Sequence, residues 1–311
     1  IVTPSGISSV SFLDEVETVN ALIPRLKQQG IETIVVLVHE GGIQAAPAPY
    51  NGCTGISGPI VDIANGFDDE VDVVISGHTH QPYNCTIDGK LVTSAFSFGR
   101  LVTKVDLTIN RATGEVVTKA ADNRIVTRDV TKDAAQTALI AKYNAIAAPL
   151  ANRVIGSITG TITRTNNAAG ESALGDVIAD AQLEATDDPG LGDAVMAFMN
   201  PGGIRADLTY LGSAAGEGDG NVTYGEMFTV QPFGNSMVTM TLTGAQIDTL
   251  LEQQFVGCGQ TANRILQVST GFGYTWTAGG AACAKVNPLS ITLNGIPVAA
   301  ASTYRVTVNS F

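Results

Sequence analysis

The sequence is poor in the features that mark several common classes of protein. It has no uninterrupted apolar run of about 18 residues, so it predicts no transmembrane helix. Basic residues are scarce: 17 Lys and Arg stand against 29 Asp and Glu, which gives a formal net charge of −12. This balance argues against binding to nucleic-acid polymers, which requires many neutralised phosphates. With 44% hydrophobic residues, the chain of 311 residues can fill ordinary cores, and its length favours two domains.

Neither end of the sequence has the features of a natural terminus. The first residues, IVTPSG, contain neither a start methionine nor a signal peptide. The last residues, TYRVTVNSF, stop inside an alternating pattern that is typical of a strand. We therefore expect the sequence to be a fragment, or a processed piece, of a longer protein.

Cysteine is also rare, with four residues and no CxxC motif, which excludes a zinc ribbon or a thioredoxin-like motif. The four fall into two sequence-local pairs, Cys53 with Cys85 and Cys258 with Cys283. As disulfides, each would contribute about 3 kcal/mol in the loop-entropy model. The even number and the low lysine content favour an oxidising setting, so we expect a secreted, periplasmic or cell-wall protein. Four buried free thiols are the alternative.

Hydrophobic periodicity predicts that the first part of the chain is an α/β domain. Residues 11–29 have apolar side chains at three- and four-residue steps, which is typical of a helix. The continuous apolar run 34–38 is typical of a parallel strand buried on both faces, and residues 71–76 repeat it. Residues 91–128 alternate in polarity, which indicates an antiparallel layer.

A second α/β pattern follows. Residues 132–153 predict one long helix that links the two parts. Helices near 172–186 and 244–255 then alternate with strands near 194–199 and 237–242. The predicted organisation is a first domain over 1–131, a linker helix over 132–153 and a second domain over 154–311.

All three histidines follow predicted buried strands. His39 stands in VHEGG after the first strand, and His78 and His80 stand in SGHTH after the second. In open α/β sheets, ligands bind in the crevice beyond the carboxyl ends of the strands, and neutral imidazole is a common ligand of transition metals. We therefore predict that the three histidines bind metal, with His78 and His80 in a bent loop. A structural role is the usual alternative for a single histidine.

These motifs resemble a known family. VHEGG and SGHTH are similar to two of the five signature blocks of the calcineurin-like metallophosphoesterases. GESALGDVIADA, NPGGIR and QPFGN are similar to the carboxy-terminal domain of the secreted 5′-nucleotidases. The resemblance implies the C-terminal portion of a metallophosphoesterase α/β sandwich, joined by a helix to an α/β substrate domain. It also implies that the intact protein hydrolyses nucleotide phosphate esters with two divalent ions, such as zinc or manganese.

The resemblance assigns the metal and phosphate contacts to particular residues. His39 and His78 resemble ligands of one metal ion, and His80 resembles a ligand of the other. Arg205 in NPGGIR resembles a phosphate ligand, because a guanidinium fork suits a phosphate group. Arg164 resembles a second phosphate-binding arginine. For Arg205, an ordinary surface position after a turn is the alternative.

The resemblance further implies a nucleotide or nucleoside as the partner. Phe233 in QPFGN and Phe311 resemble the two walls of a clamp that stacks on the base, an interaction that tolerates any base. Asn200 would lie near the base or ribose, with Asn235 near the clamp, and Gly271 would permit close approach of the base.

The sequence departs from the family in one respect. The DxH, GDxxxxxP-like and GNHE/D blocks, which carry the other metal ligands and the catalytic histidine, are absent from these residues. The resemblance therefore predicts a piece that binds metal weakly and is inactive alone, with the upstream segment as a separate partner and no catalytic residue of its own. A UDP-sugar hydrolase, a 2′,3′-cyclic nucleotide phosphodiesterase, a thiosulfohydrolase and a non-catalytic nucleotide-binding protein are the alternatives.

Overall fold

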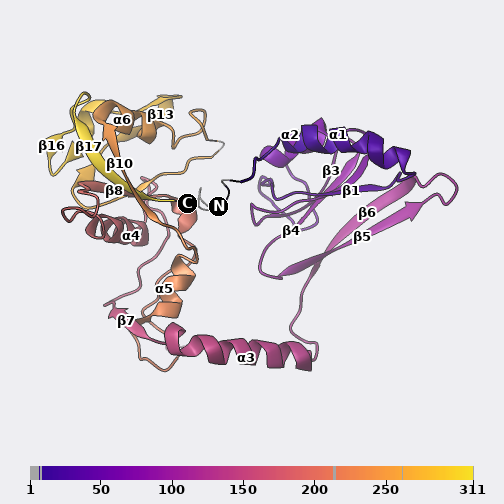
Figure 1. Ribbon diagram of the computed structural model, residues 1–311, viewed down its shortest axis with the longest axis horizontal. Helices are drawn as coiled ribbons and strands as arrows, with labels where there is room; N and C mark the ends of the chain where they lie inside the picture. Colours follow the sequence, from indigo (N-terminus) through magenta and orange to yellow (C-terminus); the bar gives the residue numbers. More distant parts are fainter. Residues whose placement is uncertain (1–6, 8, 213–214, 261, 311) are drawn as a thin grey trace. The chain divides into compact units, whose positions relative to one another are not determined.

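The computed structural model describes residues 7, 9–212, 215–260 and 262–310. The chain folds into two compact units, which divide after Thr131 (Figure 1). We call Val10–Thr131 the N-terminal unit and the part from Lys132 onward the C-terminal unit. Each unit combines helices and strands around its own apolar core, which confirms the predicted α/β fold class.

The N-terminal unit is built on a four-stranded sheet of order β1-β2-β4-β3. Strands β1, β2 and β4 are parallel, and β3 runs antiparallel to β4. The bounds are Ile34–Leu37 for β1, Val71–Ile75 for β2, Pro82–Ile87 for β3 and Lys90–Ala95 for β4. Because the three parallel strands run the same way, the loops that follow them leave one shared edge of the sheet.

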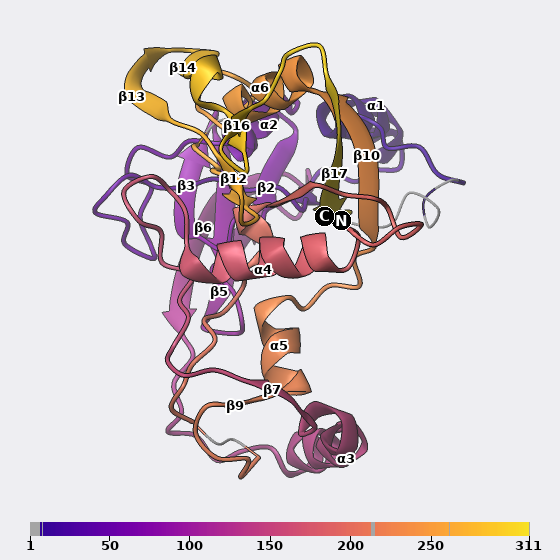
Figure 2. The ribbon, with the colours of Figure 1, turned by 90° about the vertical axis from the view of Figure 1, so that its left-hand side faces the viewer.

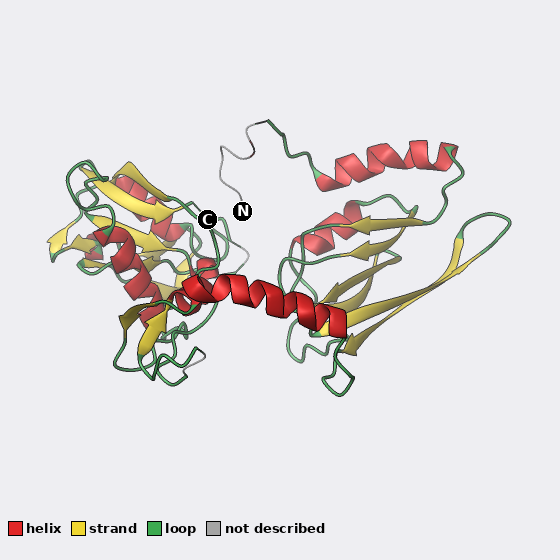
Figure 3. Ribbon diagram, turned by 60° about the horizontal axis from the view of Figure 1, so that its bottom comes forward, coloured by secondary structure: helices red, strands yellow, loops and turns green. Residues whose placement is uncertain are grey.

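Two helices cover one face of this sheet (Figure 3). Helix α1 spans Glu15–Gln28, and Asp14 caps it by accepting a hydrogen bond from the backbone N–H of Glu17. Helix α2 spans Pro59–Gly66, with proline at the position where its missing N–H costs nothing. Both helices contribute apolar side chains to one core cluster, which also contains Val74 and Val92 of the sheet.

A β-hairpin lies on the other face. It consists of β5 (Leu101–Ile109) and β6 (Val116–Ile125), joined through a turn at residues 110–114. The hairpin contacts β3 and β4. Val35 and Leu37 of β1 are 41% and 77% exposed, so the predicted burial of this strand on both faces is wrong within the described residues. The reason is that β1 is an edge strand, whereas the hairpin packs mainly on β3 and β4 at the other side of the sheet.

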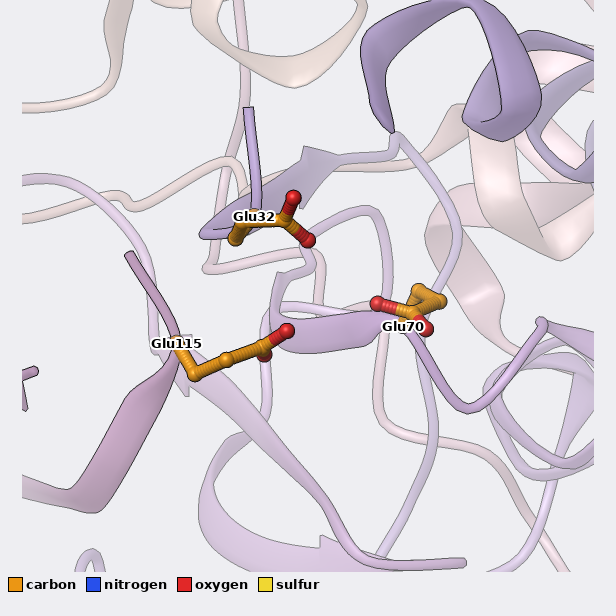
Figure 4. A group of neighbouring side chains, drawn as sticks. All are labelled: Glu32, Glu70 and Glu115. Atoms are coloured by element: carbon orange, nitrogen blue, oxygen red, sulfur yellow. The ribbon is translucent and has the colours of Figure 1, made fainter. Parts of the chain in front are cut away.

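An ion-pair network ties the hairpin turn to α1 and the sheet. Glu32, Glu70 and Glu115 point toward one another (Figure 4), and their carboxylate oxygens lie within 4.8 Å. Lys27 is paired with all three, and these hydrogen bonds raise the pKa of its ammonium group. The ion pairs with Lys27 explain why the three glutamates lie together, so we assign the cluster no ligand.

The C-terminal unit centres on a second four-stranded sheet, of order β10-β17-β8-β11. Helix α4 packs on β8, β11 and β17, and α6 contacts β10 (Figure 2). Its main helices are α3 (Ala134–Ala151), α4 (Ala173–Glu184), α5 (Tyr224–Val230) and α6 (Gly244–Glu252). The strands of the sheet are β8 (Met196–Met199), β10 (Met237–Thr243), β11 (Gln267–Val268) and β17 (Thr303–Asn309). Helix α3 contains no buried residue.

Smaller elements complete this unit. A three-stranded sheet and two strand pairs flank the main sheet. Their strands are β7 (Val154–Ser157), β9 (Asn221–Thr223), β12 (Phe272–Gly273), β13 (Trp276–Ala281), β14 (Ala284–Val286), β15 (Thr292–Leu293) and β16 (Ile296–Pro297). Short 3₁₀ turns lie at Pro201–Gly203 and Pro288–Ser290.

Both predicted disulfides form, Cys53–Cys85 and Cys258–Cys283, and no cysteine is free. The free-thiol alternative is therefore wrong. The first bridge joins the loop before α2 to β3, so it connects segments that follow the two histidine motifs. None of the described helices has both the length and the apolar character required to cross a membrane.

Candidate functional site

The two histidine motifs lie at the shared carboxyl edge of the N-terminal sheet. The rings of His39 and His78 meet edge to face, with centroids 5.3 Å apart. His78 and His80 have φ angles of 63° and 54°, so their loop is bent, as the sequence predicts. Positive φ is uncommon for residues other than glycine and frequently occurs at functional sites.

The histidine loops are bonded directly to each other. The backbone N–H of Gly77 donates to the carbonyl of Glu40 at 3.0 Å, and the Thr79 hydroxyl donates to the carbonyl of Gly42 at 2.8 Å. A Cβ atom at Gly41 would lie 2.2 Å from the carbonyl oxygen of Gly77. Only glycine permits this approach, which explains why Gly41, the first glycine of VHEGG, has no side chain.

Tyr83 lies beneath both loops and was not recognised from the sequence. Its side chain is fully buried. Its hydroxyl lies 2.5 Å from the Ser76 hydroxyl and also hydrogen-bonds to the backbone of Gly42. Burial raises the pKa of this phenol, so it stays protonated. Tyr83 therefore joins the end of β2 to the loop after β1. The sequence pattern around Tyr83 is that of an ordinary core residue in a strand. No sequence signal therefore distinguishes its role from that of other buried aromatic residues.

The side chains at this edge supply some, but not all, of the ligands that a metal ion requires. The imidazoles of His39 and His78 are adjacent and solvent-exposed, and imidazole suits zinc or manganese. Within the described residues, no set of three potential ligands that includes a histidine has its ligand atoms within 4.8 Å of one another. The structure thus brings His39 and His78 together. His80 instead places its ring 5.3 Å from that of Phe98, edge to face.

The predicted substrate residues gather at an edge of the C-terminal sheet. Strands β8 and β17 are parallel and β10 is antiparallel to β17, so Asn200, the QPFGN loop and Ser310 emerge at one edge. Ser236 and Ser310 are joined through a backbone bond of 3.0 Å and a side-chain bond of 3.1 Å. Phe311, the predicted second wall of the clamp, lies outside the described residues.

The two predicted phosphate-binding arginines occur close together. The guanidinium Nη1 of Arg164 donates to the carbonyl of Ile204 at 3.2 Å, and Ile204 directly precedes Arg205. The guanidinium carbon of Arg205 lies 5.2 Å from the ring centre of Phe233, a cation–π contact. Both arginines are exposed, and Phe233 is half-buried. This arrangement brings two cations and one aromatic ring together at one edge of the sheet.

The other predicted substrate residues are Asn200, Asn235 and Gly271, and only the two asparagines lie at the same edge as the arginines. Asn200 and Asn235 are half-buried at the same edge. Asn200 also lines a cavity of about 220 Å³ together with Leu250 and Arg264. Gly271 has a φ of 91°, and a Cβ there would lie 2.3 Å from Asn294 Oδ1. The turn against Asn294 therefore accounts for this glycine without a ligand.

Comparisons with known proteins identify the class. Residues 154–311, just over half of the chain, match the family described as 5′-nucleotidase, C-terminal domain. The chain is 32% identical over its full length to the endonuclease YhcR of Bacillus subtilis, and it covers 23% of that protein. It is 31% identical over its full length to the cell wall protein Lmo0130 of Listeria monocytogenes, and it covers 40% of that protein.

A solved structure agrees with these matches. The 5′-nucleotidase precursor of Thermus thermophilus superimposes with a TM-score of 0.70 at 26% identity, over 96% of this chain and 58% of that chain. The chain therefore belongs to the family with a 5′-nucleotidase C-terminal domain. It spans about a quarter to two fifths of the two curated relatives. The disulfides and the cell-wall relative agree with the predicted extracytoplasmic setting.

Proposed function

We propose that the intact protein is a metal-dependent 5′-nucleotidase that acts outside the cytoplasm. The observation that carries this proposal is the pairing of Arg205 with Phe233 at the carboxyl edge of the C-terminal sheet, with Arg164 beside it. A guanidinium group recognises a phosphate, and an aromatic ring stacks on a base. A nucleotide carries both groups at a short separation.

The residues of the C-terminal unit bind and orient the substrate in this proposal. Arg205 and Arg164 hold the phosphate, Phe233 and Phe311 hold the base, and Asn200 and Asn235 contact the nucleoside. Residues 154–311 then form the substrate domain, residues 1–131 the metal-binding domain, and residues 132–153 the linker. These roles follow from the family and from the chemistry of each side chain.

The N-terminal unit contributes metal ligands. His39 and His78 would hold one divalent ion, and His80 would hold a second with ligands from outside these residues. Bound ions of this kind polarise a phosphoryl group and lower the pKa of a coordinated water molecule. The histidines would orient the ions, and the hydrogen bonds between their loops hold the two loops together. We expect this chain alone to hold metal weakly and to lack turnover, with an upstream segment completing the site.

The proposal is tested by binding, which does not depend on turnover. We expect Phe233→Ala to weaken AMP and adenosine alike, by about 1–3 kcal/mol, because stacking acts on the base. We expect Arg205→Ala to weaken AMP by about 1.5–3 kcal/mol and adenosine far less, because only AMP carries a phosphate. Isothermal titration calorimetry of both variants with both ligands measures the contrast.

Lys142→Ala provides the matched control, because Lys142 is an exposed cation on α3 of the same unit. It should leave both affinities unchanged. An equal loss of AMP and adenosine binding in Arg205→Ala would remove the phosphate role of Arg205. Phosphate-dependent binding without turnover, even when the full-length protein is tested, would favour the non-catalytic nucleotide-binding alternative.

A further inference from the structure

A third loop leaves the carboxyl edge of the N-terminal sheet, after β4, and the family motifs do not include it. Residues Ala95–Arg100 read AFSFGR and follow a buried strand, just as the histidine motifs do. Phe96 and Phe98 both have positive φ angles, 66° and 60°. Bulky residues rarely adopt this conformation, and it persists only where the surroundings hold it.

Arg100 supplies the interactions that hold these rings. Its guanidinium carbon lies 5.0 Å from the ring centre of Phe96 and 5.6 Å from that of Phe98. Phe98 in turn contacts the ring of His80. Among the described residues, the Arg100 side chain has no carboxylate within ion-pair distance and no hydrogen-bond acceptor. Stacking uses the face of a guanidinium and leaves its five N–H donors for other partners.

A pocket opens beside Arg100. Its volume is about 270 Å³, and it is lined by Tyr50, Pro82, Phe96, Arg100, Leu101 and Ile125. Five of these six residues are apolar or aromatic, and Arg100 is the one charged residue among them. Tyr50 and Ile125 are 44% and 59% exposed, so the pocket is open to solvent. We call it the Arg100 pocket.

We propose that the Arg100 pocket binds a small organic anion with a planar apolar body. Apolar walls favour a ring system, and a small number of placed polar groups sets the orientation of a ligand. The uncompensated guanidinium selects for a negative group, such as a carboxylate, sulfonate or phosphate. This site needs no metal ion and none of the substrate residues of the C-terminal unit, so it goes beyond the proposed nucleotidase function.

The choice of an anion depends on Arg100 itself, because the net charge of −12 of the whole chain repels anions. Acidic residues outnumber basic ones by 29 to 17, so the chain offers many carboxylates with which a cation can pair. Lys27, Lys104 and Arg124 of the same unit are each paired with at least one carboxylate. Arg100 is exposed and contacts two aromatic rings instead, and these contacts leave its N–H donors available to a ligand.

The test uses two probes that share a ring system and differ in charge. Naphthalene-2-sulfonate is an anion, and 2-naphthol is neutral. With the 311-residue chain and no added metal, NMR titration should place the sulfonate at Leu101 and Ile125. Arg100→Gln should weaken the sulfonate about tenfold, as expected for loss of one charge-assisted hydrogen bond, and should change 2-naphthol binding less than about twofold.

Arg111→Gln is the matched control, because Arg111 is an exposed arginine in the β5–β6 turn and does not line the pocket. It should leave both affinities unchanged. Arg100→Lys, which keeps the charge, should recover part of the sulfonate affinity and serves if Arg100→Gln does not fold. Equal effects on both probes, or shifts confined to other residues, would overturn the proposal. None of these results depends on AMP binding, so the nucleotidase proposal fails or stands separately.

Discussion

Asp176 in the first turn of α4 has an unusual carboxyl group. Burial, with a further contribution from Glu171, raises its pKa to about 6. One carboxylate oxygen is buried and has no hydrogen-bond partner among the described residues. Its pKa in the unfolded chain is about 3.9, so the folded state binds the proton more tightly. The free energy of unfolding therefore falls as the pH rises from about 4 to about 6.

We expect Asp176→Asn to remove this pH dependence. The variant should be more stable than the parent by about 1 kcal/mol at pH 7.5 and equally stable at pH 4, since the parent carboxyl is then largely protonated. The gain is smaller than the pKa shift alone implies, because solvent screens a group that is only partly buried. Urea unfolding followed by the fluorescence of Trp276, the sole tryptophan, measures it.

The control for this prediction is Asp187→Asn, because Asp187 lies exposed just beyond the same helix. It should give the same stability difference from the parent at both pH values. A stabilisation by Asp176→Asn that is equally large at pH 4 would show that its cause is not the raised pKa.

At the scale of elements, the geometry of the candidate metal site at the carboxyl edge of the N-terminal sheet depends on bonds between loops that follow different strands. Glycine contacts and two hydrogen bonds join the loop after β1 to the loop after β2. Tyr83, at the start of β3, adds a buried hydroxyl that contacts both. The orientation of His39 relative to His78 is therefore a property of three elements together.

We expect Tyr83→Phe to destabilise the N-terminal unit by about 1–2 kcal/mol, because the Ser76 hydroxyl and the Gly42 backbone lose a buried partner. Zn²⁺ affinity should fall by about tenfold, the lower end of what residues behind a metal ligand contribute. Far-UV circular dichroism during urea unfolding measures the stability, and calorimetry measures the affinity. Tyr143→Phe, on exposed α3, should change neither quantity. Unchanged stability in Tyr83→Phe would contradict the role given to this hydroxyl.

At the scale of the whole molecule, each unit has its own core. The N-terminal core contains Ile60, Val74 and Val92, and the clusters of the C-terminal unit are drawn from separate residues. We expect the units to unfold in separate transitions, since cooperativity follows shared buried contacts. Ile60→Ala, at a fully buried position of α2, should destabilise the N-terminal unit by about 2–5 kcal/mol.

The same variant distinguishes separate from joint unfolding. Trp276 belongs to the C-terminal unit, so its fluorescence midpoint should not move in Ile60→Ala, while the circular dichroism transition broadens toward lower urea. Equal displacement of both signals would show that the chain unfolds as a single cooperative body.

Much of the fold is determined by the sequence alone. The 3.6-residue period of residues 11–29, the apolar runs at 34–38 and 71–76, and the helical pattern of residues 132–153 are local patterns. A helix or strand of the predicted kind forms within each of them. The cysteine pairs are local too, and both close as predicted. A strand-end rule placed His39 beside His78 because parallel strands share an edge.

Other features depend on the tertiary structure, because local sequence patterns contain no information about them. Which strand lies at the edge depends on strand order, and this order left Leu37 exposed although its run reads as buried. The role of Tyr83 comes from a hydroxyl that meets two other segments, and an alternating strand pattern reports burial but not hydrogen-bond partners. Arg100 contacts the rings of Phe96 and Phe98 and has no ion pair among the described residues, and neither fact can be read from the sequence. Sequence periodicity determines which residues share a face of one element, whereas these sites depend on contacts that form only when separate elements pack.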